Sequence, residues 1–300
     1  MLLAFDTNRL RNYTSSMMPE IEIPSHYNYI GVFLSLSCNL SCSYCINHTV
    51  GLNQRRKHLN GKQWAEALNR LQTRVDLPIT IQGGEPTIHK DFYEIINSVN
   101  PNKRIDLLTN IQFKTDVFIN KISNDRFNRD LPYPAIRVSY HPETMDLENT
   151  ISKVKKLQDN HYSIGLFTVD HPHTKAELEH ARKRCLEEGV LFKTKEFLGK
   201  LDGKVHGKYH YEDAVFNSSP RSVNCKTSEL LISPEGFIYR CHHDLYNKKS
   251  PIGDILSPNF KIEDKYSVCD YYGKCNPCDV KLKNNRFQKF GHCSVDITEL

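Results

Sequence analysis

The chain has 300 residues, an apolar fraction of 39%, ten cysteines and a net charge of +5 from 40 basic and 35 acidic residues. This length suits one large domain, or a large domain with a smaller appendage, and the mild, dispersed positive charge gives no sign of nucleic-acid binding. The first residues, MLLAFDTNRLRNY, contain no continuous apolar stretch, so they predict neither a signal peptide nor a membrane span. We therefore expect a cytoplasmic protein whose cysteines bind metal instead of forming disulfides.

Short β-branched or aliphatic runs alternate with amphipathic stretches of period near 3.6, which predicts strands separated by helices. Such alternation favours parallel pairing with right-handed crossovers, and hence an α/β sheet or a barrel-like arc of six units. Functional residues are expected at the carboxyl ends of the strands. The predicted strands span residues 29–36, 77–82, 104–109, 135–140, 163–169 and 191–196.

Three cysteines follow the first predicted strand in the stretch CNLSCSYC: Cys38, Cys42 and Cys45. Three thiolates at this spacing can hold a cubane iron–sulfur cluster and leave one iron without a protein ligand. A cluster used only for electron transfer normally has every iron ligated by protein, so an open iron indicates chemistry. The alternative is a zinc site with one further ligand, such as His48.

A second motif, Gly83-Gly84-Glu85-Pro86, ends the second predicted strand. The glycines permit close approach of the backbone to a ligand, Glu85 offers a carboxylate to a ligand ammonium, and Pro86 stiffens the turn. Alone this motif is weak, but it follows the cysteine triplet by one βα unit, at the same face of the predicted sheet.

Together these motifs resemble the radical S-adenosylmethionine (SAM) superfamily, whose core carries Cys-x3-Cys-x-aromatic-Cys after the first strand and GGE after the second. Tyr44 stands at the aromatic position. The resemblance covers residues 29–196 and implies a partial (β/α)6 TIM-like barrel. It also implies that SAM chelates the open iron of a [4Fe–4S] cluster, with Glu85 and the adjacent backbone at its ammonium. An electron from an external donor such as flavodoxin or ferredoxin would cleave the sulfonium, giving a 5′-deoxyadenosyl radical that removes a substrate hydrogen atom.

Other strand ends carry polar residues. By the same resemblance, residues at the ends of the third and fourth strands contact the ribose and the methionine carboxylate of SAM, which makes Asn110 and Ser139 candidates. Polar residues that merely cap strands are the alternative. His141 is a candidate substrate-facing base, with an exposed loop histidine as its alternative.

Six of the ten cysteines lie in the C-terminal region, from Cys225 to Cys293. Cys225 and Cys241 flank a predicted hairpin with strands at 230–232 and 237–239 and a turn at 234–236. A Cys-x2-Cys pair, Cys275 and Cys278, can supply two more ligands to the same site. Four such thiolates suit either a structural zinc ion or an iron–sulfur cluster.

The stretch Cys-x10-Gly-x4-Cys resembles the opening of the SPASM and twitch extensions of radical SAM enzymes, which house auxiliary [4Fe–4S] clusters. The later cysteines depart from a complete SPASM array. The resemblance thus implies one auxiliary cluster on Cys225, Cys241, Cys275 and Cys278. Cys269 and Cys293 are left spare, and a second, incompletely protein-bound cluster on these two cysteines is the alternative. The expected regions are an N-terminal extension (1–28), the barrel (29–200) and a cysteine-rich auxiliary-cluster extension (201–300).

The expected function is a radical SAM enzyme of the oxidoreductase type that abstracts hydrogen from a small metabolite or carbohydrate. Its auxiliary cluster would take up the second electron or bind the substrate. One alternative is a maturase that modifies a ribosomal peptide, but the roughly 28 residues before the first strand are too few for a leader-binding domain. A non-catalytic zinc or iron–sulfur scaffold is the alternative of another class. No residue pattern identifies the substrate.

Overall fold

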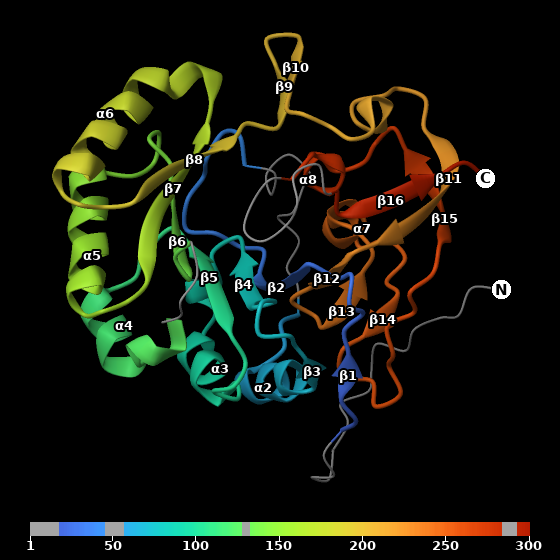
Figure 1. The fold of residues 1–300 in the computed structure, drawn as a ribbon, viewed down its shortest axis with the longest axis horizontal. Coiled ribbons are helices and arrows are strands. Elements are labelled where there is room, and N and C mark those ends of the chain that lie inside the picture. Colours follow the sequence, from blue (N-terminus) through green and yellow to red (C-terminus); the bar gives the residue numbers. More distant parts are fainter. Residues whose placement is uncertain (1–17, 46–56, 128–132, 284–292) are drawn as a thin grey trace.

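The computed structural model describes residues 18–45, 57–127, 133–283 and 293–300. Its centre is a sheet with the strand order β14-β13-β12-β2-β4-β5-β6-β7-β8 (Figure 1). From β2 to β8 every neighbouring pair is parallel. The six predicted strands are confirmed within two residues at each end: β2 (Tyr29–Ser35), β4 (Ile79–Gly83), β5 (Ile105–Thr109), β6 (Ile136–Tyr140), β7 (Ile164–Asp170) and β8 (Phe192–Glu196).

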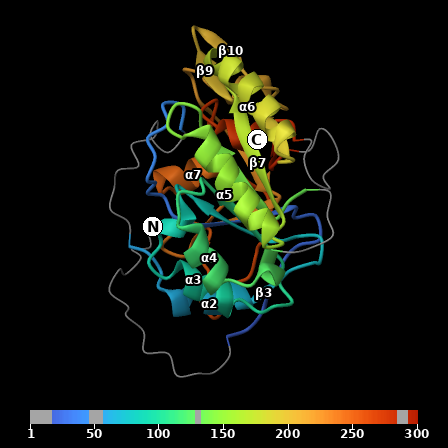
Figure 2. The same ribbon diagram turned by 90° about the vertical axis from the view of Figure 1, so that its left-hand side faces the viewer.

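Helices cover the outer face of this curved sheet (Figures 1 and 2). They pack through fully buried side chains such as Trp64 and Leu68 on α2, against sheet residues such as Ile81 and Leu107. Asn60 caps α2 reciprocally with Gln63, which fixes where this helix begins. The helices are α2 (Gly61–Asn69), α3 (Phe92–Ser98), α4 (Thr115–Lys121), α5 (Leu147–Asp159) and α6 (Lys175–Glu187).

The predicted C-terminal hairpin is confirmed, and it extends the central sheet. Its first strand, β12 (Glu229–Ile232), runs parallel to β2, and β13 (Phe237–Tyr239) and β14 (Gly253–Asp254) follow antiparallel. A second sheet places β11 (Arg221–Thr227) between β15 (Ser267–Tyr272) and β16 (Val295–Thr298). The short helices α7 (His242–Asn247) and α8 (Pro277–Val280) complete this region.

Two small strand pairs lie outside these sheets. β1 (Ile21–Glu22) pairs with β3 (Leu71–Gln72) in parallel, and β9 (Gly199–Leu201) forms a hairpin with β10 (Lys204–His206) that projects from the molecule (Figure 1). In the described parts of the chain, no helix is both long enough and apolar enough to cross a membrane.

A buried ion pair joins two neighbouring strands of the barrel. A guanidinium nitrogen of Arg137 on β6 lies 3.1 Å from a carboxylate oxygen of Asp106 on β5, and the two side chains are 7% and 0% exposed. Removing one member of such a pair leaves the other charge buried without its ion-pair partner. This typically lowers the free energy of unfolding by about 3–5 kcal/mol.

We predict that Asp106→Ala lowers the free energy of unfolding by about 3–5 kcal/mol, and that the double change Asp106→Ala with Arg137→Met lowers it by less. Denaturant unfolding measures both. Asp76→Ala is the control, because the Arg74–Asp76 pair is exposed and should contribute no more than about 1 kcal/mol. Equal losses in the single and double variants would contradict the prediction.

Candidate functional site

The cysteine triplet forms a loop that directly follows β2. Cys42 is buried, whereas Cys38 and Cys45 are half-buried, and the backbone N–H of Cys45 donates to the carbonyl of Cys42 at 3.1 Å. Burial raises the pKa of the Cys42 thiol to about 11. The three soft thiol donors suit iron in a cluster. His48, the alternative zinc ligand, lies outside the described residues.

A close backbone contact holds the cysteine loop against the glycine motif. The N–H of Gly84 donates to the carbonyl of Ser35 at 2.8 Å, and the N–H of Glu85 donates to that of Ser37 at 2.9 Å. A Cβ atom on Gly84 would lie 2.2 Å from the Ser37 oxygen, and one on Gly83 would lie 1.9 Å from the Ser35 oxygen. In this structure the glycines are therefore needed for the approach of two protein loops.

Glu85, which follows Gly84 in this contact, is only 1% exposed. Its Oε1 accepts hydrogen bonds from the backbone N–H of Thr87 (3.1 Å), from the Thr87 hydroxyl (2.5 Å) and from the Thr109 hydroxyl (2.8 Å), and its Oε2 accepts from the N–H of Asn110 (2.7 Å). Burial raises the pKa of Glu85, and these hydrogen bonds oppose the rise. Glu85 thus connects the ends of β4 and β5.

Asn110 contacts the triplet itself. Its side-chain nitrogen lies 3.7 Å from the sulfur of Cys38 and donates to the side-chain oxygen of Asn39 at 2.7 Å. Ser139, the other residue predicted to contact SAM, is half-buried on β6 beside Phe167 of β7. The contact of Asn110 with a candidate ligand was not predicted, because it depends on the fold that brings β5 beside the cysteine loop.

The loop after β6 supports the cysteine loop from the other side. The hydroxyl of Tyr44 lies 2.8 Å from Nδ1 of His141, and the Tyr44 ring stacks on His171 with 5.1 Å between centroids. Burial lowers the pKa of His141, which favours its neutral form. Glu143 accepts a hydrogen bond from the Ser43 N–H at 2.6 Å, and the Thr144 hydroxyl lies 3.6 Å from the Cys42 sulfur.

Sequence reasoning missed Glu143 and Thr144. Their position could have identified them, because both follow the fourth predicted strand closely. Polar residues at the carboxyl end of a strand in a parallel sheet commonly face the ligand site. His141, by contrast, was singled out, and the structure places it against Tyr44 of the triplet motif.

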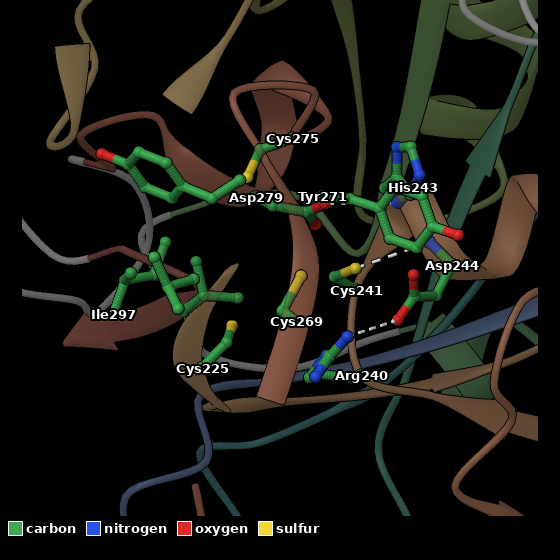
Figure 3. A pocket seen from close by; sticks show the side chains of 13 residues that line it. Cys225, Arg240, Cys241, His243, Asp244, Cys269, Tyr271, Cys275, Asp279 and Ile297 are labelled. Atoms are coloured by element: carbon green, nitrogen blue, oxygen red, sulfur yellow. Dashed lines mark hydrogen bonds and ion pairs between the residues drawn. The ribbon is translucent and has the colours of Figure 1, made fainter. Parts of the chain in front are cut away.

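Four C-terminal cysteines line one pocket between the second sheet, α7 and α8. Figure 3 shows Cys225, Cys241, Cys269 and Cys275 around this pocket, with the sulfur of Cys241 turned toward the backbone N–H of Asp244, which donates to it at 3.5 Å. Cys278 and Cys293 are not among the residues that line it. The pocket is therefore lined by three of the four cysteines predicted to hold the auxiliary cluster, together with Cys269, whereas Cys278 is not part of its lining.

Charged groups surround this pocket. Arg240 forms an ion pair with Asp244 at 3.0 Å (Figure 3), and Asp279 accepts from the backbone N–H of His242 at 2.9 Å. Burial raises the pKa of the Cys225 thiol to about 12, and the positive charge of Arg240 partly offsets this. A site rich in thiols with a nearby guanidinium suits an anionic thiolate cluster.

Among the described residues, no three His, Cys, Asp or Glu side chains converge closely enough to bind one metal ion. Thiolates that hold a cubane each contact a different iron, so they need not converge on one point. Both cysteine groups supply the soft sulfur donors that such clusters require.

Six parallel strands joined by five helices, with a cysteine triplet after the first strand, define an α/β partial barrel that carries a candidate metal-binding loop. Residues 32–189 match the model of a protein family, the Radical SAM superfamily. The chain belongs to this superfamily. Membership implies a [4Fe–4S] cluster and SAM as cofactors.

Solved structures show the same fold. The anSMEcpe structure with bound AdoMet and a Cp18Cys peptide has a TM-score of 0.52 and 14% identity, covering 79% of this chain and 78% of that one. Streptococcus suis SuiB bound to S-adenosylmethionine has a TM-score of 0.50 and 14% identity, covering 78% of this chain and 63% of that one. At these identities the likeness concerns the fold alone.

Curated relatives match a shorter stretch. A probable GTP 3′,8-cyclase of Methanopyrus kandleri is 28% identical over 81 residues, and an S-adenosylmethionine-dependent nucleotide dehydratase of Selenomonas ruminantium is 30% identical over 84 residues. Each match covers 27% of this chain, and 26% and 29% of the respective relatives. The chain thus matches little more than a quarter of the length of either protein.

We predict that Gly84→Ala separates the cysteine loop from the glycine motif, because the added Cβ meets backbone oxygens that cannot rotate away. Reconstituted protein should lose about one cubane of iron and about 1–3 kcal/mol of stability. Iron analysis and denaturant unfolding measure these losses. The control is Gly165→Ala, whose Cβ meets side-chain atoms of Leu191 and Pro134 at 3.0 Å. Full iron content in Gly84→Ala would refute the proposed role of this contact.

Proposed function

We propose that this chain is a radical SAM enzyme that abstracts a hydrogen atom from a small metabolite and completes a two-electron oxidation with the help of an auxiliary cluster. The observation that carries the proposal is the cysteine triplet just after the carboxyl end of β2, where the preceding Ser35 and Ser37 carbonyls accept hydrogen bonds from the N–H groups of Gly84 and Glu85. Family membership supports the catalytic class. The four C-terminal cysteines that line one pocket support the auxiliary cluster.

Cys38, Cys42 and Cys45 would ligate three irons of the first cluster. With SAM bound, this cluster would supply the 5′-deoxyadenosyl radical by reductive cleavage of the sulfonium. The chain's own contribution is to position the site and to exclude water from it. Glu85 fixes the loops at the ends of β4 and β5, and Tyr44 packs between His141 and His171, which orients the cysteine loop.

The auxiliary cluster is proposed on Cys225, Cys241, Cys269 and Cys275. Their common pocket is the supporting observation, and the guanidinium of Arg240 offsets the negative charge of the thiolates. Cys278 faces a different environment, near Lys281, Lys283 and Glu229. In this assignment Cys278 and Cys293 do not ligate the cluster.

Two substrate classes are favoured by different observations. The nucleotide enzymes among the curated relatives favour a small metabolite, which is our first choice. The likeness to anSMEcpe, which was solved with a peptide, favours a peptide as the second choice. An external one-electron donor of the flavodoxin or ferredoxin type is required in both cases.

The catalytic proposal predicts that anaerobically reconstituted protein releases 5′-deoxyadenosine when SAM and a reductant are added. The triple change of Cys38, Cys42 and Cys45 to Ala should lower this release at least a hundredfold, because no thiolate then holds the first cluster. Chromatographic measurement of the nucleoside tests this. A colourless wild-type protein that binds stoichiometric zinc and cleaves no SAM would leave only the scaffold alternative.

The auxiliary-site proposal predicts that Cys269→Ala and Cys278→Ala behave differently. Cys269→Ala should lower the iron content by up to one cubane and change the spectrum of the auxiliary cluster. Cys278→Ala should retain both clusters. Iron quantification and electron paramagnetic resonance (EPR) spectroscopy test the pair. The reverse result would instead assign Cys278 as the fourth ligand, and two fully loaded variants would exclude Cys269.

A further inference from the structure

A polar network at the carboxyl ends of β4 and β5 reaches the cysteine loop through Asn110. Glu85 already accepts hydrogen bonds from four protein donors, which come from Thr87, Thr109 and Asn110. A carboxylate has about four lone-pair sites, so the protein itself satisfies much of its bonding capacity. The N–H bond to Oε2 of Glu85, at 2.7 Å, fixes the backbone of Asn110.

The side chain of Asn110 is equally constrained. Its oxygen accepts from the backbone N–H of Gln112 at 3.1 Å, which requires the nitrogen to face the other way. The nitrogen has two N–H groups: one donates to Asn39 at 2.7 Å, and the other points to the sulfur of Cys38 at 3.7 Å. Asn110 is 4% exposed, so this amide is buried and its donors are used within the protein.

The sulfur of Cys38 also accepts from the backbone N–H of Leu40 at 3.4 Å. In a reduced cluster the sulfur atoms carry more negative charge than in the oxidised cluster, so a donor aimed at a sulfur stabilises the reduced form more. Hydrogen bonds to cluster sulfurs are among the factors that set reduction potentials. A buried donor acts more strongly than an exposed one, because water does not compete with it.

We infer that Asn110 is a positioning residue for the first cluster, whose side-chain amide donates to the Cys38 thiolate and raises the midpoint potential for one-electron reduction. One electron from the external donor enters the cluster, no proton is taken up, and the amide stabilises the added negative charge. This inference rests on the proposed function, since it requires the cluster on Cys38, Cys42 and Cys45. It replaces direct contact with SAM as the main role of the Asn110 side chain.

The test is an EPR-monitored redox titration of the reconstituted holoenzyme without SAM. Asn110→Leu keeps the approximate volume but removes the donor, and Asn110→Asp replaces the donor with a carboxylate oxygen. Both should shift the midpoint potential to more negative values, and Asn110→Asp should shift it further because it adds a negative charge near the sulfur. Gln112→Ala is the matched control, since it removes a side-chain amide that donates to the backbone carbonyl of Asn110 at 3.4 Å and has no contact with the Cys38 sulfur, so the potential should stay unchanged.

Iron content and SAM affinity are measured on the same samples. Wild-type potential in a fully loaded Asn110→Leu or Asn110→Asp would overturn the inference, and so would weakened SAM binding at an unchanged potential, which would make Asn110 a SAM ligand. If Asn110→Leu loses the cluster, the smaller Asn110→Ala is titrated in its place with the same expectation. A wild-type protein that forms no reducible cluster would contradict the proposed function itself, which is a separate outcome.

Discussion

The contact between the cysteine loop and the glycine motif is the constraint on which the rest of the site depends. The ladder between β2 and β4 is irregular between Phe33 and Ser35, where β2 ends and the chain turns into the cysteine loop. Gly84 allows the second loop to approach until N–H groups and carbonyls pair across the gap. The loop that carries Cys38 is thus fixed by backbone hydrogen bonds, which depend little on the identity of the neighbouring side chains.

The same strand connects the two cysteine groups. Phe33 on β2 packs edge-on against His242 and Tyr246 of α7, with ring centroids 5.9 and 6.0 Å apart, and α7 starts directly after Cys241. The phenol of Tyr246 lies within electrostatic reach of both Cys45 and Cys278. Because β12 also pairs with β2, one continuous sheet and one apolar cluster set the separation of the two groups. A fixed separation is what electron exchange between two clusters would require.

The sequence was sufficient for elements defined by local patterns. The six strands and the hairpin between Cys225 and Cys241 consist of apolar runs bounded by turn residues, and the structure confirms them. The spacing of the cysteines in the sequence did not predict which of them line the C-terminal pocket. Cys269 lies opposite Val223 only because β15 pairs with β11, a contact between segments more than 40 residues apart. Cys275 and Cys278 look equivalent in the sequence, yet Asn276 caps α8 between them and the chain changes direction there.

Glu85 and Asn110 show a further limit of motif-based interpretation. Their positions at strand ends were identified from the sequence, but their roles depend on whether the protein already satisfies their polar atoms. A buried polar group without a hydrogen-bond partner destabilises the folded protein whether or not a ligand is bound. Glu85 has four protein donors, and both donors of the Asn110 side chain are directed at protein atoms. Under the inference drawn for Asn110, a residue satisfied in this way would act on a bound cofactor through the geometry and the electrostatic field that it imposes on the cofactor's direct ligands.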